Sequence, residues 1–417
     1  MQYFKHSELA AKYHVSLKTV HNWIDAAKEG KLPLLLRTAK SGTYIANTAE
    51  NTQTLGTLAE KGKKYRNTLH HKVLKPKLEF YDIYSPRQIL DIINNLTVYR
   101  EIPRQYNYLE GGSSNWDNWS KRLIAEKTSN ILQGTIQLLD TNMDAIDRLI
   151  ANGTKINVID LGVGNVLPVK DLLLHLIDSG VLHRYIAIDI SESMLSLAEK
   201  NVKTWFGNKI TFEKYLRDIT HERFDDLIVD DMLKKEAEKT INLVLLLGGT
   251  AHNFRTYHEC LDVAYGSMNK DDLLIYTNKL DTETSRRYFD FSADPNSVAL
   301  AATHSLSPSH KYILDLMNID ESLYDVESGF DEAEYMRYIR IRMKTAITIQ
   351  FKFGDTIMRN VTLEKGEAVL LFRYWHMSAQ RIISEFEKIG FMLLHSNITS
   401  DRQYFLSISG VETKQLS

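Results

Sequence analysis

The chain of 417 residues has a single cysteine, Cys260, and no long apolar segment. One cysteine cannot form a disulfide within the chain, so a reducing compartment suits it best. No apolar run reaches the roughly 18 residues that a membrane-spanning helix needs. The first ten residues lack the apolar stretch of a secretory signal, and no His, Cys and Asp residues have metal-site spacing. We therefore expect a cytoplasmic protein without a membrane segment or a metal.

Charge is spread unevenly along the chain, although the formal net charge is only −2. Residues 1–77 contain 14 Lys and Arg against 5 Asp and Glu, so they carry +9 and the remainder carries −11. A basic head on an acidic body fits a polyanionic partner, and it equally fits a solvated basic tail. The length predicts two or three domains.

Residues 1–50 have the pattern of a helix-turn-helix. Two apolar stripes, Leu9–Tyr13 and Val20–Ile24, flank a break at His14, and Ser16 is placed to cap the second helix. The string LAAKYHVSLKTVHNWI resembles the helix-turn-helix of MerR-like and excisionase-like regulators, although His14 replaces the glycine often found in the turn. In those regulators the second helix enters the major groove of DNA.

That resemblance implies that residues 1–77 bind DNA. Residues 34–45 would form a wing of this module, which makes the helix-turn-helix a winged one. The polar residues 51–77 are expected to be a linker, in part helical, to the larger part of the chain, residues 78–417.

Apolar segments alternate with helical ones from residue 156 onward. The expected strands are Ile156–Gly162, Tyr185–Ile190, Ile210–Phe212, Ile241–Gly248 and Asp272–Asn278. The expected helices between them are Leu167–Ile177, Met194–Trp205 and Asn253–Met268. This alternation predicts an α/β fold with a parallel, doubly wound sheet. Residues 78–150 are expected to be mostly helical, and residues 346–351 and 403–409 to be strands that close the far edge.

The first strand runs into the turn VIDLGVGN, which contains Asp160, Gly162 and Gly164. Doubly wound sheets bind ligands at the carboxyl ends of their strands, and glycine allows the backbone to approach a ligand closely. A dinucleotide fingerprint needs a third glycine, but Leu167 stands at that position. This turn, followed by the acid Asp189 at the end of the second strand, favours S-adenosylmethionine instead.

Further residues complete the expected cofactor site. Asp189 is placed to accept hydrogen bonds from both ribose hydroxyls, and Asp218 from the adenine amino group. The alternative for Asp189 is that it caps the helix containing Glu192. Gly248, where the fourth strand ends, is the last residue of the expected cofactor site. Asn253 either caps the helix that follows or turns its amide toward a substrate.

Three segments together resemble those of the histidine-specific methyltransferases of the ergothioneine pathway. They are VIDLGVGN, YIAIDISESML and LLLGGTAHNF. The resemblance covers roughly residues 95–409. It implies a Rossmann-like class I methyltransferase with a second, smaller α+β substrate domain. The core would span about residues 130–280, and the substrate domain about 78–129 and 281–400.

The resemblance also implies substrate-site residues. Asn253 matches a substrate-contacting asparagine, and Tyr108 in YLEGGS matches a substrate-binding tyrosine. Tyr288 lies where the family has a catalytic-site tyrosine near cofactor and substrate. Arg286 and Arg287 either pair with a substrate carboxylate or lie in solvent.

One departure from the family concerns substrate choice. The family reads the imidazole of histidine with a Glu-x-Ser motif, whereas LLFRYWHMS places Phe372 and Tyr374 at those positions. Two aromatic rings cannot orient an imidazole through a charge-assisted hydrogen bond. We therefore expect an amino-acid-like or other small amine as methyl acceptor, and not histidine.

Three functions remain open. The first is a small-molecule N-methyltransferase, the second a DNA-binding regulator that senses S-adenosylmethionine without turnover, and the third a methyltransferase acting on a macromolecule. None of the seven prolines lies in an Asp/Asn-Pro-Pro-aromatic motif, and Cys260 does not follow a proline, which disfavours base methylation. The sequence does not indicate an oligomeric state.

Overall fold

The computed structural model describes residues 3–39, 42–69, 72–109, 111–126, 130–150, 154–229, 240–282, 306, 308–331, 333–353 and 357–411. The chain divides into two compact units. Unit 1 consists of Met1–Val73 and Thr345–Thr348, and unit 2 of Leu74–Lys344 and Ile349–Ser417. None of the helices in these described ranges is long and apolar enough to cross a membrane.

Unit 1 begins with two helices joined by a short turn. Its elements are α1 (His6–Lys12), α2 (Leu17–Lys28), the antiparallel strands β1 (Leu36–Ala39) and β2 (Gly42–Ile45), and α3 (Ala49–Leu69), followed at the boundary by β3 (Lys72–Leu74). Ser16 caps α2 as predicted, because its hydroxyl accepts from Thr19 N at 3.1 Å. His14 in the turn has a φ of 49°, the conformation that glycine often supplies there.

The segment predicted as a linker contains helix α3. Leu55 of α3 is fully buried with Leu9 and Trp23 in the small core of unit 1. Ala59, one turn after Leu55, is also buried in this core, so tertiary packing supports α3 although the segment has little apolar periodicity.

The first part of unit 2 is helical, as predicted. It contains α4 (Leu78–Ile83), α5 (Pro86–Val98), the 3₁₀ helix η1 (Arg104–Tyr108), α6 (Gly111–Ala125), α7 (Ile131–Thr141) and α8 (Met143–Leu149). Ser85 caps α5 and accepts from Gln88 N, and Pro86 occupies the first helical position, where its missing N–H costs nothing.

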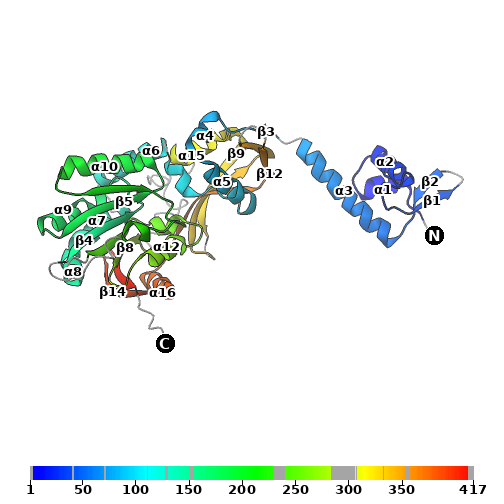
Figure 1. Ribbon diagram of the computed structural model, residues 1–417. Coiled ribbons are helices and arrows are strands. Elements are labelled where there is room, and N and C mark those ends of the chain that lie inside the picture. Colours follow the sequence, from blue (N-terminus) through cyan, green and yellow to red (C-terminus); the bar gives the residue numbers. More distant parts are fainter. Residues whose placement is uncertain are drawn as a thin grey trace. The chain divides into compact units, whose positions relative to one another are not determined.

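A seven-stranded sheet forms the centre of unit 2 (Figure 1). Its strands are β4 (Lys155–Leu161), β5 (Leu182–Asp189), β6 (Phe212–Leu216), β7 (Thr240–Leu246), β8 (Leu273–Lys279), β14 (Phe391–Ile398) and β15 (Tyr404–Val411). The order is β14-β15-β8-β7-β4-β5-β6, and the five strands β4 to β8 are parallel to one another. β15 pairs antiparallel with both β8 and β14, so the order departs from that of a dinucleotide-binding sheet.

Helices cover both faces of this sheet (Figure 1). Val158 of β4 packs toward α7, α8, α9 (Lys170–Asp178) and α10 (Glu192–Phe206), whereas Ile159 packs toward α12 (Glu259–Ser267) and α16 (Ala379–Ile389). Short 3₁₀ turns lie between these elements: η2 (Leu167–Val169), η3 (Asp225–Leu227) and η5 (Thr250–Asn253). The near-continuous apolar strands of the sequence are therefore buried on both faces, as in other parallel sheets.

Strands β9 to β13 lie between β8 and β14 in the sequence and do not belong to the central sheet. β9 (Tyr324–Asp331), β10 (Met336–Met343) and β13 (Ala368–Trp375) form an antiparallel sheet in the order β13-β10-β9. β11 (Ile347–Phe353) is a neighbour of β12 (Ile357–Leu363). Before them lie α15 (Pro308–Leu316) and η6 (Glu321–Leu323).

Several boundaries differ from those predicted. The strand predicted at residues 403–409 is β15 of the central sheet, but the one predicted at residues 346–351 corresponds to β11, which lies in a separate sheet, so that part of the edge prediction is wrong. The third strand begins only at Phe212, because β6 is a half-buried edge strand without an apolar run. The helix predicted from Asn253 begins at Glu259, since the glycines Gly248 and Gly249 first lead into η5.

Candidate functional site

A cavity of about 430 Å³ lies at the carboxyl ends of β4 and β5. Nine of the residues predicted for the site line it. They are Asp160, Gly162, Gly164, Asp189, Asp218, Gly248, Asn253, Phe372 and Tyr374. Since β4 lies between β5 and β7, the cavity occupies the point where the strand order reverses, the usual place for a ligand in such a sheet.

The turn after β4 has an unusual backbone. Gly162 and Gly164 have positive φ values of 75° and 54°, and Val166 follows with 66°. A β-branched residue in this region is rare and strained, and Val166 is held there by complete burial. The glycines are therefore required by backbone conformation, which explains their place in the motif.

Helix α6 fixes this turn from outside the motif. The amide of Asn165 donates to Asp117 Oδ1 at 3.0 Å and to Ser120 Oγ at 2.6 Å, and all three side chains are buried. A Cβ on Gly164 would lie 3.2 Å from Nε1 of Trp116. Trp116 and Trp119 of α6 line the cavity, and no sequence motif indicated either of them.

Two buried carboxylates lie beside the turn. Asp160 accepts a hydrogen bond of 2.7 Å from the hydroxyl of Tyr185, while burial raises its pKa to about 7. Asp189 is only 9% exposed and accepts from the backbone N–H of Ser191 at 3.0 Å. Burial raises the pKa of Asp189 to about 6, against the opposing hydrogen bonds from the N–H groups of Ser191 and Gly164.

The alternative that Asp189 caps α10 is wrong. Ser191 is the N-cap residue, and its hydroxyl accepts from Met194 N at 3.3 Å. Asp189 lies before the cap with its carboxylate at the cavity.

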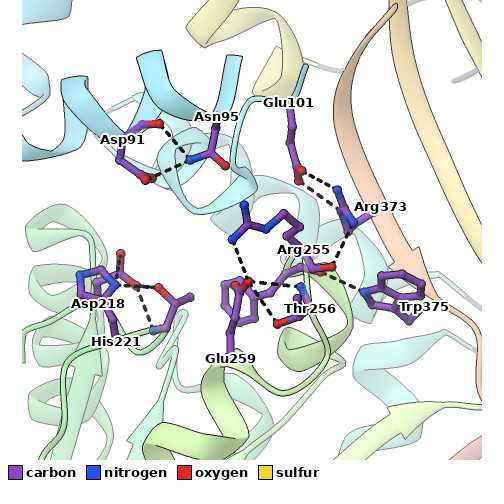
Figure 2. A network of polar contacts seen from close by, with 12 residues as sticks. Asp91, Asn95, Glu101, Asp218, His221, Arg255, Thr256, Glu259, Arg373 and Trp375 are labelled. Carbon is purple, nitrogen blue, oxygen red and sulfur yellow. Dashed lines mark hydrogen bonds and ion pairs between the residues drawn. The ribbon is translucent and has the colours of Figure 1, made fainter. Parts of the chain in front are cut away.

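Asp218 lies two residues after β6. One of its oxygens accepts from the backbone N–H of Thr220 at 3.0 Å and from the Thr220 hydroxyl at 2.6 Å. The other lies 3.7 Å from Nδ1 of His221 (Figure 2). These contacts orient the carboxylate on the wall of the cavity.

Asn253 does not cap the next helix. Its amide donates to Gly249 O at 3.2 Å, and α12 begins later, with His258 as its N-cap residue. The capping alternative is therefore wrong, and the Asn253 side chain lines the cavity.

The two faces of β13 have different contacts. Phe372 and Tyr374 line the cavity. On the alternate positions, Arg373 pairs with the buried Glu101, and Trp375 Nε1 donates to Phe254 O at 2.9 Å (Figure 2). The second face thus anchors β13 to the segment after η5, which holds the aromatic pair in place.

A buried polar cluster behind Tyr374 was not foreseen from the sequence. The Tyr374 hydroxyl donates to Asn278 Oδ1, and the Asn278 amide lies 2.7 Å from His252 Nε2. His252 also contacts the hydroxyl of Tyr276 and the carbonyl of Trp375. Burial lowers the pKa of His252 to about 3, so this imidazole is neutral and acts as a hydrogen-bonding support for the cavity wall.

Some predicted residues cannot be placed. Tyr288, Arg286 and Arg287 lie outside the described residues. The backbone of Tyr108 belongs to η1, but its side chain is also outside the described part. In the described ranges, no group of three His, Cys, Asp or Glu side chains is arranged to hold a metal ion.

Cys260 lies in the core and is not a nucleophile of the site. It is fully buried on α12, and burial raises the pKa of its thiol. We expect the native protein not to react with a thiol reagent such as Ellman's reagent, and to titrate one thiol after denaturation. Rapid labelling of the native protein would contradict this burial.

The central sheet and the cavity together indicate the kind of ligand that the protein binds. A parallel α/β sheet with a glycine turn and buried acids at its switch point binds a nucleoside-containing ligand. The family model of the histidine-specific, S-adenosylmethionine-dependent methyltransferases matches residues 88–409. The chain belongs to this family and is a methyltransferase that uses S-adenosylmethionine.

Solved structures with a similar fold are distant in sequence. An S-adenosylmethionine-dependent methyltransferase from Clostridium acetobutylicum is 10% identical, with 72% of this chain and 98% of that chain covered and a TM-score of 0.35. The magnesium protoporphyrin IX methyltransferase from Synechocystis is 11% identical, with 78% and 100% covered and a TM-score of 0.36. The 1,6-didemethyltoxoflavin-N1-methyltransferase from Burkholderia thailandensis is 10% identical, with 74% and 90% covered and a TM-score of 0.34.

With TM-scores below 0.5, none of these three structures adds to the family assignment. No curated protein matches the chain. The family name mentions histidine, so the match does not support the expectation that histidine is not the acceptor.

Proposed function

We propose that the chain transfers the methyl group of S-adenosylmethionine to the nitrogen of a small amino-acid-like or aromatic amine, and not to histidine. One observation carries the proposal: Phe372 and Tyr374 line the same cavity as Asp189 and the glycine turn. A site that reads imidazole needs a charged acceptor or a paired polar group there. Phe372 offers an apolar ring, and the hydroxyl of Tyr374 is already bonded to Asn278.

The cofactor end of the cavity fits S-adenosylmethionine. Asp189 is a buried acceptor for ribose hydroxyls, Asp218 an acceptor for the adenine amino group, and Gly162, Gly164 and Gly248 allow the backbone to come close. Asp160 supports the turn through Tyr185. The cofactor supplies a methyl group on a sulfonium, and the chain's own residues align the amine and exclude water.

The acceptor end is assigned to residues from several elements. Asn253 and Tyr108 hold the polar end of the acceptor, and Phe372 and Tyr374 contact its flat side. Tyr288 is the proposed catalytic residue near the transferring methyl, where a hydroxyl assists loss of the amine proton. Under this proposal, α4 to α6 and the sheet β13-β10-β9 form the smaller substrate domain.

Cofactor affinity should depend on pH through Asp189. Ribose hydroxyls donate to the ionised carboxylate, whereas burial raises the pKa of Asp189 in the unliganded protein to about 6, so the protonated form dominates only below that pH. We expect the affinity for S-adenosylhomocysteine to be constant above about pH 7 and to fall toward tenfold per unit below about pH 6. Calorimetry across this range measures it, and Asp189→Asn should flatten the profile. A profile in the wild type as flat as that of the variant would contradict ribose binding by Asp189.

The proposed acceptor class is tested by methyl release. We expect histidine to be a poor acceptor and at least one aromatic amine or aromatic amino acid to be methylated faster by tenfold or more, because an imidazole that lies against Phe372 and Tyr374 without a hydrogen-bond partner costs about 1–3 kcal/mol. The assay follows formation of S-adenosylhomocysteine with each acceptor at equal concentration. Robust trimethylation of histidine would show that the site reads imidazole after all.

A second function is proposed for unit 1, namely DNA binding through a winged helix-turn-helix. The observation that favours it is the arrangement of α1, the turn at His14, α2 and the β1–β2 pair, with Lys18, His21 and Asn22 exposed on α2. In such modules the exposed face of the second helix contacts the major groove.

Binding of DNA should be strongly salt-dependent, since residues 1–77 carry +9. We expect a mobility shift of a DNA duplex by the full chain at low salt. Lys18→Ala with Asn22→Ala should weaken it about tenfold, whereas Lys61→Ala on the exposed side of α3 should change it little. No shift at low salt would leave this unit without a role in DNA binding.

A further inference from the structure

Three basic side chains from different elements line the cavity around Phe372. Arg104 of η1 has its guanidinium carbon 4.5 Å from the centre of the Phe372 ring, and that of Arg337 of β10 lies 5.8 Å from it. Lys279, the last residue of β8, lines the same cavity and is only 8% exposed. Arg337 is the direct cross-strand partner of Tyr374, so both side chains lie on the face of the sheet that borders the cavity.

The positive charges act on one another. The pKa of Lys279 is lowered to about 8, first by burial and then by the charge of Arg337, while Asp401 opposes the shift. The imidazole of His310, whose Nε2 lies 3.1 Å from Arg104 Nη1, has a pKa lowered to about 3 by burial and by Arg104 and Arg337. His310 is therefore neutral and adds no charge.

Acids line the cavity elsewhere. In its described wall, Glu126 follows α6, Asp160 and Asp189 lie at the carboxyl ends of β4 and β5, and Asp218 follows β6. Arg104, Lys279 and Arg337 lie on η1, β8 and β10 instead. Arg122 and Arg217 also line the cavity, and they pair with Glu126 and Asp226. The acids of the described wall therefore gather at the cofactor end, and Arg104, Lys279 and Arg337 gather around Phe372.

We propose that Arg104, Lys279 and Arg337 form an anion subsite, which binds a carboxylate or phosphate group carried by the methyl acceptor. The proposal rests on the proposed function, because it needs the acceptor to occupy this cavity. Guanidinium groups pair with the two oxygens of a carboxylate or phosphate, and a buried ammonium adds a point charge. The acceptor would then be an aromatic or amino-acid-like amine with an anionic group away from the methylated nitrogen.

Matched probes test the subsite in the full chain saturated with S-adenosylhomocysteine. The anionic probe is para-aminomethylbenzoate, and the neutral one is para-aminomethylbenzamide, which has the same ring and amine. We expect calorimetry to show binding of the acid roughly ten- to a hundredfold tighter than of the amide, the range for hydrogen bonds to a charged group. Para-aminomethylphenyl phosphate, compared in the same way, distinguishes a phosphate from a carboxylate.

Substitutions of the basic residues test whether the preference for the acid over the amide arises at this subsite. Lys279→Met and Arg337→Met should each reduce the preference for the acid by about tenfold, with unchanged affinity for S-adenosylhomocysteine as the test of folding. Lys365→Met and Arg359→Met replace exposed residues of the same types and should keep the preference. If one cavity variant fails to bind S-adenosylhomocysteine, the other carries the comparison.

The titrations distinguish failure of the anion subsite from failure of the proposed function. Equal affinity for acid and amide, or no binding of either in the saturated complex, overturns the subsite and leaves the methyltransferase assignment intact. A preference that persists in both cavity variants also overturns it. Failure of the wild-type protein to bind S-adenosylhomocysteine would instead contradict the proposed function, and the subsite with it.

Discussion

Replacing Asp189 with alanine is expected to weaken binding of S-adenosylhomocysteine by about 1.5–3 kcal/mol, or roughly ten- to a hundredfold. The carboxylate is 9% exposed and is oriented by the backbone N–H groups of Ser191 and Gly164 toward a cavity at the strand ends. Hydrogen bonds between ribose hydroxyls and a buried, fixed carboxylate would be lost together in the variant. Isothermal titration calorimetry of the full chain measures the change directly.

Asp178→Ala is the matched control for this experiment. Asp178 is exposed at the end of α9 and does not line the cavity, so its removal should leave the affinity unchanged. If Asp189→Ala binds S-adenosylhomocysteine as well as Asp178→Ala does, the ribose assignment is wrong.

Replacing Gly249 with alanine is expected to remove most of the methyl-transfer activity, by more than about tenfold, and to lower the melting temperature. Gly249 has a φ of 80°, which costs another residue about 1–2 kcal/mol. A Cβ there would also lie 2.7 Å from both Asn278 Oδ1 and Tyr374 OH, which are hydrogen-bonded to each other. The new methyl group would therefore displace the aromatic wall of the acceptor end.

Alanine substitutions at two other glycines separate the effect of backbone strain from the effect of displacing Tyr374. Gly180 has a φ of 69° and Gly248 one of 68°, and a Cβ at either meets nothing within 4 Å. Gly180→Ala should share the loss of stability but keep full activity, because it is remote from the cavity lining. Gly248→Ala borders the cofactor end and should affect cofactor affinity more than acceptor turnover. Full activity in Gly249→Ala would contradict the placement of Tyr374 beside the acceptor.

The cofactor half of the molecule could be predicted from local sequence. Strands β4, β5, β7 and β8 are buried on both faces, so each appears as a short apolar run. The ends of two of these runs indicate where the cofactor residues lie: Asp160, Gly162 and Gly164 at the end of β4, and Asp189 at the end of β5. The parallel order then brings Asp218 and Gly248 to the same edge, since carboxyl ends of parallel strands meet there.

The acceptor half could not be predicted in the same way. β9, β10 and β12 are half-buried or exposed strands with charged residues, and their sequences lack an apolar run. Arg104, Lys279 and Arg337 are far apart in the chain and meet only through the pairing of β10 with β13 and the position of η1. The site of Phe372 and Tyr374 came from a resemblance to a family motif, and nothing in the spacing of His252 indicated its buried contacts with Asn278 and Tyr276.

A crystal structure of the chain with S-adenosylhomocysteine and the best acceptor from the amine panel tests the central claim most directly. We expect the ribose at Asp189, the flat part of the acceptor against Phe372 and Tyr374, and the acceptor nitrogen facing the sulfur of the cofactor product. Histidine bound between Phe372 and Tyr374 with both imidazole nitrogens hydrogen-bonded to the protein, or an acceptor bound outside this cavity, would contradict the proposed function.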